Sequence, residues 1–152
     1  MLDVDQNIID TQDDKVWAPI HYAASNGQQK IVDILIKRGA DFRLETKSTD
    51  TPGSLAATKG HLEVLRVLVE NGMGADEGPS SIKSNYIHYA AHAGHTEVVK
   101  YLLSKGADPT HGIGTFSRLL SSNNAYQLAK RAGHEELTRI LAKAVKEWKR
   151  SH

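Results

Sequence analysis

The chain has 152 residues, of which 39% are hydrophobic, and its 19 basic and 18 acidic residues leave a net charge of +1. This balance argues against a dedicated nucleic-acid binder, which normally carries a clear basic excess. The chain contains no cysteine, which excludes disulfides, thiol catalysis and cysteine-ligated zinc or iron–sulfur sites.

The N-terminal segment, residues 1–14, is acidic and has neither the basic region nor the apolar core of a signal peptide. No apolar run approaches the roughly 18 residues that a membrane-spanning helix needs. We therefore expect a cytoplasmic or nuclear protein that has no membrane partner. The length predicts a single domain, and we expect it to be a monomer on its own.

Four segments of the chain are copies of one another, and each ends in a glycine. These glycines lie 33, 34 and 39 residues apart. Each copy reads as a short helix, a tight turn, a longer helix and a connecting hairpin. The four short segments are residues 19–27, 52–60, 86–94 and 125–133.

Copy one is preceded by residues 9–13, which match a connecting hairpin. Its first helix starts at Pro19, and its second helix places Ile31, Ile34 and Leu35 at spacings of three and four. A glycine with a left-handed backbone commonly ends a helix. Glycines therefore predict the ends of seven helices. They are Gly27, Gly60, Gly94 and Gly133 for the first helices, and Gly39, Gly72 and Gly106 for the second helices of copies one to three.

Copy two starts with Thr51-Pro52, but Gly53 and Ser54 replace the apolar residue and the histidine of copies one and three. Glycine within a helix costs about 1 kcal/mol relative to alanine. We therefore expect copy two to be the weakest repeat. The double substitution Gly53→Leu with Ser54→His is expected to raise the melting temperature.

The last two copies are joined by a longer segment, residues 110–123, which carries apolar side chains such as Ile113 and Phe116. Packing of this segment against copies three and four and contact with a partner both remain open. In copy four, Lys130 replaces the second small alanine, and one apolar stripe continues from Glu135 to about Arg150. Copy four is therefore expected to be a C-terminal cap.

The pattern Pro19-Ile20-His21-Tyr22-Ala23-Ala24 and the period near 33 resemble the ankyrin-repeat family. The resemblance implies an all-α solenoid of stacked helix-turn-helix units with projecting hairpins. Residues 1–152 would form one domain, with repeats at about 13–45, 46–79, 80–112 and 119–150. It also implies that Gly-Ala-Asp opens each hairpin, at residues 39–41, 74–76 and 106–108.

The histidines invite a metal hypothesis, since His88 and His92 would share one face of a helix. Most histidines, however, occupy repeat positions: His21 and His88 the motif histidine, and three others the glycine-histidine turn. The zincin pattern needs a glutamate after its first histidine, where this chain has Tyr89. We therefore expect no metal site, no cofactor and, because no nucleophile or phosphate-loop motif occurs, no catalytic residue.

The resemblance implies that a partner binds the concave surface formed by hairpin tips and exposed first-helix positions. Lysines outnumber acids there, which favours a protein partner with an acidic surface. We expect a non-catalytic adaptor or stoichiometric inhibitor; the alternatives are an enzyme with an unrecognised site and a nucleic-acid binder. The candidate binding residues are Lys15, Trp17, Asn26, Lys47, Asp50, Lys59, Lys83, His92, Phe116 and Arg131.

Trp17 is the strongest single candidate because tryptophan is enriched among residues that dominate interface energy. Alternatively, its ring folds back onto the Tyr22 region and protects the first repeat.

Overall fold

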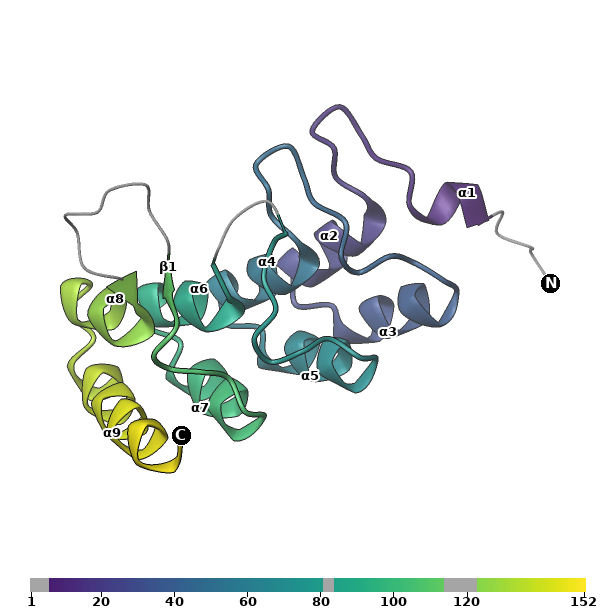
Figure 1. Ribbon diagram of the computed structural model, residues 1–152. Coiled ribbons are helices and arrows are strands. Elements are labelled where there is room, and N and C mark those ends of the chain that lie inside the picture. The colour runs from purple at the N-terminus through teal and green to yellow at the C-terminus, as the bar shows by residue number, and fades with distance from the viewer. Residues whose placement is uncertain (1–5, 81–83, 114–122) are drawn as a thin grey trace.

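The computed structural model describes residues 6–80, 84–113 and 123–152. Its helices form two layers, with the first helix of each copy in one layer and the second in the other (Figure 1). The elements are α1 (Gln6–Ile9), α2 (Pro19–Ser25), α3 (Gln29–Lys37), α4 (Pro52–Lys59), α5 (Leu62–Glu70), α6 (Tyr86–Ala93), α7 (Thr96–Ser104), β1 (Gly112–Ile113), β2 (Asn123–Asn124), α8 (Ala125–Arg131) and α9 (Glu135–Ser151).

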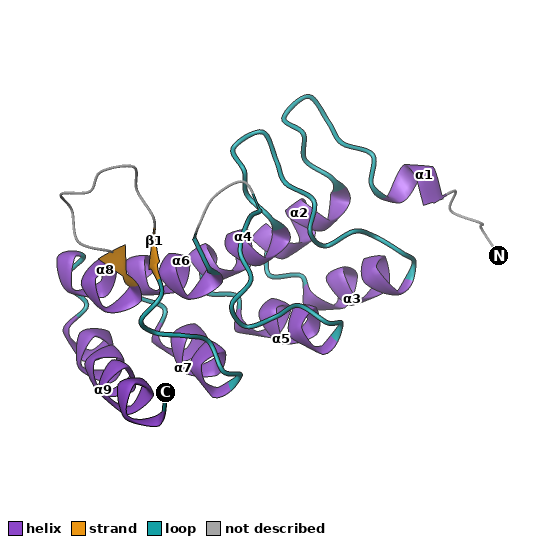
Figure 2. Ribbon diagram, in the orientation of Figure 1, coloured by secondary structure: helices purple, strands orange, loops and turns teal. Residues whose placement is uncertain are grey.

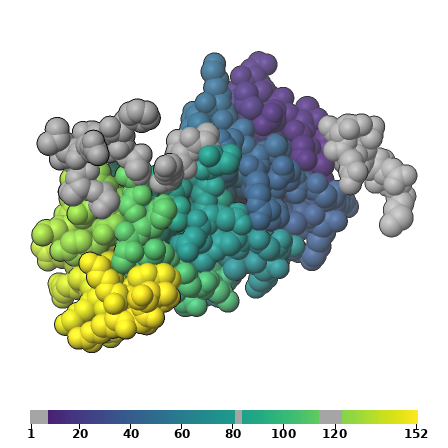
Figure 3. Space-filling view, viewed as in Figure 1, coloured from purple at the N-terminus to yellow at the C-terminus, as the bar shows by residue number. Residues whose placement is uncertain are grey.

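The helical solenoid expected from the repeats is confirmed, and helix predominates over strand (Figure 2). The only paired strands in the described part of the chain are β1 and β2, which place Ile113 opposite Asn123 at the start of copy four. The copies follow one another along the molecule from the N-terminal to the C-terminal end (Figure 3). Hairpins stand beside the first-helix layer, most clearly before α2 and before α4 (Figure 1).

Paired alanines allow neighbouring first helices to approach closely. Ala56 and Ala57 of α4 are fully buried, as are Ala90 and Ala91 of α6, and α4 contacts both α2 and α6. In α8 the corresponding second position is Lys130, which is exposed and lies 5.9 Å from the centre of the Tyr126 ring. α9 extends over 17 residues, against nine in each of the other second helices.

Successive copies are joined by a histidine at each turn. Gly60 ends α4 in the left-handed conformation, with φ of 77°, and a Cβ there would lie 2.5 Å from Nδ1 of His95. The ring of His95 approaches this closely because its Nε2 donates to the Thr58 carbonyl at 2.8 Å. His61 and His134 make the same bond to the carbonyls of Ser25 and His92. We call these three bonds the histidine ladder; they are made by the histidines that the sequence placed at the glycine-histidine turns.

The expected opening of the second hairpin at Gly74-Ala75-Asp76 is wrong by two residues. Met73 is buried and its N–H bonds to the carbonyl five residues earlier, as do the N–H groups of Ala40 and Ala107. The structural counterpart of Gly39-Ala40-Asp41 is therefore Gly72-Met73-Gly74.

Gly53 has a packing role that the sequence did not reveal. Tyr86 stands where copies one and two have proline, and its ring, 1% exposed, covers Gly53. A Cβ on Gly53 would lie only 2.6 Å from Cζ of that ring. This geometry argues against the expected rise in melting temperature for Gly53→Leu with Ser54→His, because the leucine Cβ would overlap the Tyr86 ring unless that ring moves.

The missing histidine of copy two is also compensated. In copies one and three, Nε2 of His21 and His88 donates to the carbonyls of Leu44 and His111 in the following hairpin. Ser54 is too short to reach the equivalent carbonyl of Glu77. That carbonyl instead accepts the N–H of Tyr86 at 3.0 Å, a donor that a proline would lack. One substitution thus supplies both the ring over Gly53 and the bond that Ser54 cannot make.

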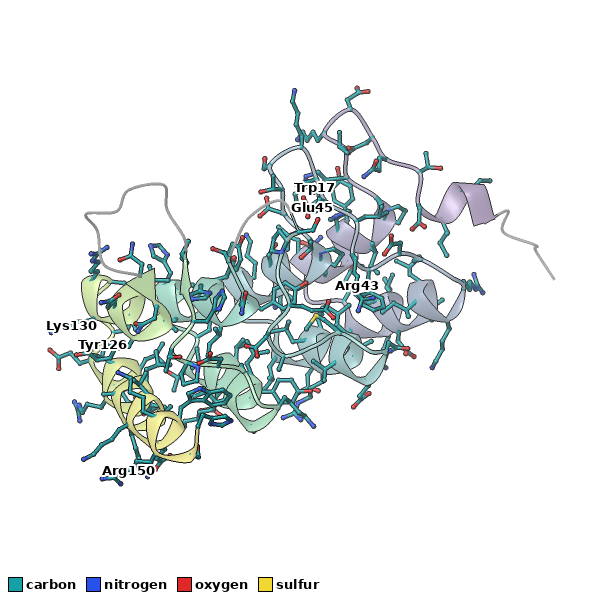
Figure 4. All side chains as sticks on the ribbon, viewed as in Figure 1. Trp17, Arg43, Glu45, Tyr126, Lys130 and Arg150 are labelled. Atoms are coloured by element: carbon teal, nitrogen blue, oxygen red, sulfur yellow. The ribbon has the colours of Figure 1, made fainter. Side chains whose placement is uncertain are left out.

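An ion pair completes the junction between copies one and two. Arg43, which is labelled in Figure 4, donates to both carboxylate oxygens of Glu77, at 2.9 and 3.1 Å, and to the Gly72 carbonyl. Glu77 also accepts the Gly74 N–H at 2.7 Å. Burial opposes the charge on Glu77, but the bonds from Arg43 and Gly74 outweigh it and lower its pKa.

Candidate functional site

The first two hairpin tips have the same construction. Asp13 and Thr46 each accept two backbone N–H groups of their own turn through one side-chain oxygen. Val16 and Thr49 then adopt positive φ values of 63° and 68°, a conformation that costs a β-branched residue about 1–2 kcal/mol. These strained turns hold the exposed side chains Lys15 and Lys47 away from the helices.

Trp17 is half-buried and does not project freely from the first hairpin. Its ring centre lies 4.9 Å from that of Tyr22 and 5.9 Å from that of His21. The Tyr22 hydroxyl donates to the Asp13 carboxylate, and this bond both lowers the pKa of Asp13 and raises the pKa of Tyr22. In Figure 4, Trp17 lies on the hairpin side of the molecule. The geometry supports packing of Trp17 on Tyr22.

The first-helix layer carries an unusual distribution of charge. The helices α2, α4, α6 and α8 contain no aspartate or glutamate, whereas they contain Lys59, Lys130 and Arg131. All acidic residues in the described helices belong to the second helices. We call the exposed face of α2, α4, α6 and α8 the floor; its helices offer cations and no carboxylates.

A hollow of about 270 Å³ lies in the floor between α4, α6 and α8. Its walls include apolar atoms of Tyr89, Ile113 and Leu128, all half-buried. Burial raises the pKa of Tyr89 to about 12. We call this cavity the floor hollow. Its lining residues are Thr58, Ser84, His88, Tyr89, His92, Ile113 and Leu128.

The buried histidines of the motif cap the first helices. Nδ1 of His88 accepts the Asn85 N–H while Nε2–H donates to the His111 carbonyl, so both nitrogens of the neutral ring are used. Burial lowers the pKa of His21 and of His88 and outweighs these bonds. His88 therefore has no free nitrogen for a metal beside His92. Within residues 6–80, 84–113 and 123–152, no three His, Asp or Glu side chains cluster as a metal site would require.

A sequence model of ankyrin repeats in three copies matches residues 20–113. The chain belongs to the ankyrin-repeat family. Ankyrin repeats generally mediate protein–protein interaction, and the family is typically non-catalytic. In the described part of this ankyrin chain, no helix combines the length and the apolar character needed to cross a membrane.

Relatives of the chain are much longer proteins. It is 34% identical over 85 residues to a putative E3 ubiquitin-protein ligase, XBAT31, of Arabidopsis thaliana, covering 56% of this chain and 19% of the relative. It is 37% identical over 106 residues to the bovine (Bos taurus) ankyrin repeat and SOCS box protein 3, covering 70% and 20%. The nuclear factor NF-kappa-B p105 subunit of Rattus norvegicus is 29% identical over 107 residues, covering 69% and 11%. The chain thus matches a fifth or less of each.

The predicted binding residues of this ankyrin domain fall into separate groups. Lys15 and Lys47 lie at hairpin tips, whereas Lys59, His92 and Arg131 are exposed on the floor helices. His92 lines the floor hollow, and Lys59 and Arg131 follow lining residues on the same helices.

Other predicted residues are engaged within the chain or lie outside the described residues. The Asn26 side chain donates to the Tyr22 carbonyl at the end of α2. Asp50 is half-buried, and burial raises its pKa. Lys83 and Phe116 lie outside the described residues, and so does most of the segment 110–123.

Sequence reasoning missed Tyr89 and Leu128 as surface residues. Each follows the motif histidine or its replacement, at the position that Tyr22 and Leu55 occupy in copies one and two. A large side chain at this position in every copy was the available signal. Their exposure, however, depends on what covers each copy, which no single repeat reveals.

Proposed function

We propose that this ankyrin domain is a non-catalytic protein-binding module. It acts as an adaptor or stoichiometric inhibitor that covers an acidic surface of another protein with its floor and hairpin tips. The observation that carries this proposal is the floor itself, which presents the exposed cations Lys59 and Arg131 on helices that contain no carboxylate. A surface of one sign attracts a partner of the opposite sign and speeds association.

Several titratable groups with shifted pKa values have structural partners, and the shifts of these groups do not indicate catalysis. Strongly shifted pKa values mark candidate active sites unless structural bonds explain them. Here His21 and His88 cap helices, and the carboxylate of Glu77 is held by Arg43. The names of the relatives describe larger proteins, so a ligase or transcription-factor activity is not transferred to this chain.

Photo-crosslinking in cells tests the proposal. A crosslinking amino acid replaces Lys59 or Arg131 on the floor, and matched control variants carry it at Lys146 or Lys149, exposed on α9. We expect one protein to be crosslinked from the floor positions and not from α9. Crosslinks to that protein from α9 alone, or from neither surface, would contradict the proposal. Crosslinks to RNA or DNA would favour the nucleic-acid alternative.

A further inference from the structure

The lining of the floor hollow suits an apolar occupant. Two of its polar side chains are used within the chain: both nitrogens of His88 are bonded, and the Thr58 hydroxyl donates to the Ser54 carbonyl at 2.8 Å. A polar group placed against these two side chains would lose water without gaining an equivalent partner from them. An apolar group would cover Tyr89 and Leu128 at no such cost.

The size of the hollow indicates a single side chain. Its volume of about 270 Å³ is just below the roughly 300 Å³ at which small-molecule pockets begin. Interface hot spots are commonly side chains that fill pockets of this kind. One large apolar residue of a protein segment is therefore a better match than a whole ligand.

Two cations flank the hollow. Lys59 follows Thr58, which lines the hollow, and Arg131 lies one helical turn after Leu128 on α8. Residues three apart lie on the same helix face. Among the residues that the structure describes, neither Lys59 nor Arg131 takes part in an ion pair. Two carboxylates on the hairpin side, Asp50 and Glu45, act electrostatically on Tyr89 of the hollow, and both are half-buried.

The geometry points to a specific occupant: an acidic peptide segment of the partner that inserts one large apolar side chain into the floor hollow, with its flanking carboxylates against Lys59 and Arg131. This inference rests on the proposed function and adds the chemistry of the recognised segment. The apolar anchor supplies the contact area, and the carboxylates select for segments of negative charge.

Peptide titrations followed by backbone amide NMR test this occupant on the full chain. The probe is a hexapeptide of aspartate and glutamate with one central phenylalanine. Its two matched controls replace the phenylalanine with serine, or the acidic residues with lysine. At about 1 mM, a ligand that binds with about 4 kcal/mol is half-saturating. We expect the probe to shift amides of Thr58, Tyr89 and Leu128, and each control to bind at least tenfold more weakly.

Variants of the chain locate the contact. Leu128→Glu should abolish the shifts, whereas Ile34→Glu, which makes the same kind of change at an exposed position of α3, should leave them intact. Because Leu128 is half-buried, the exposed pair Lys59→Glu with Arg131→Glu provides a second test that leaves the packing unchanged. It should weaken the acidic probe at least tenfold.

Several results would overturn the inference. Equal binding of the serine control means that charge alone acts, and equal binding of the lysine control means that only apolar contact acts. The acidic segment is rejected if about 1 mM probe causes no shift of floor amides. It is also rejected if the shifts depend on the concentration of the chain itself, or if a single-stranded oligonucleotide binds more strongly than the probe. If a protein crosslinked from the floor binds the Leu128→Glu chain undiminished, the proposed function survives and this inference fails.

Discussion

Gly53→Ala should destabilise the chain, although alanine is the better helix former. The new Cβ would lie 2.6, 2.8 and 2.9 Å from Cζ, Cε1 and the hydroxyl of Tyr86. The ring is 1% exposed, and its hydroxyl accepts a bond from Thr51 at 3.3 Å, so it has little freedom to move aside. Overpacking of this kind costs about 1–3 kcal/mol, whereas the helix gains at most about 1 kcal/mol.

The net loss in the free energy of unfolding is therefore expected to be about 1 kcal/mol, or a fall of roughly 2–4 °C in melting temperature. A second background isolates the cause. Tyr86→Leu removes the three tyrosine atoms that the new Cβ would meet, two of the ring and the hydroxyl oxygen. In that background Gly53→Ala should stabilise the chain by up to about 1 kcal/mol, because only the helix preference of alanine remains. The sign of one substitution is thus predicted to depend on its neighbour.

Urea unfolding followed by far-ultraviolet circular dichroism measures all four chains of this cycle. Repeat proteins can unfold in parts, so amide hydrogen exchange in α4 should be measured alongside. The expected coupling energy between the two positions is about 1–3 kcal/mol. An equal stabilisation by Gly53→Ala in both backgrounds would refute the reasoning, since it would mean that the ring of Tyr86 yields at no cost.

Three further substitutions test other contacts. Because burial lowers the pKa of His88, the unfolded chain takes up a proton first, so the free energy of unfolding should fall as the pH drops below 6.5. His88→Gln should weaken this pH dependence of the free energy of unfolding while keeping the helix cap, as Gln127 does in copy four. Urea unfolding of both chains across this pH range measures the difference. Trp17→Ala should lose about 1 kcal/mol with its Tyr22 contact, and an unchanged thermal melt would contradict that packing. Thr49→Asn should gain about 0.5–1 kcal/mol in urea, because asparagine tolerates positive φ; a loss would show that threonine is unstrained there.

The sequence predicted the features that recur in every copy. Periodic apolar residues and glycines were sufficient for the helix pairs and their ends, because these depend on local backbone preferences. Gly39, Gly72 and Gly106 all have positive φ, as expected. The histidines of the motif and of the turns were likewise assigned correctly from their positions.

Departures from the repeat were harder to interpret from the sequence. From the sequence of copy two alone, Gly53 is expected to weaken its helix. In the structure it leaves room for Tyr86 of the next copy, 33 residues later. Gly74-Ala75-Asp76 read alone matches the family pattern, whereas packing of Met73 sets a different register. The floor hollow combines residues of three copies. Such features depend on contacts between repeats, which the spacing within one repeat cannot predict.

The histidine ladder has a consequence for how the floor meets a partner. It anchors the backbone carbonyls of Ser25, Thr58 and His92, residues at the end of three floor helices. The spacing between these helices is therefore fixed before any partner arrives. Ordering of flexible segments is a major cost of association, and a preorganised surface avoids much of it. Binding at the floor should accordingly be close to rigid-body docking, with the ordering cost falling mainly on the incoming segment.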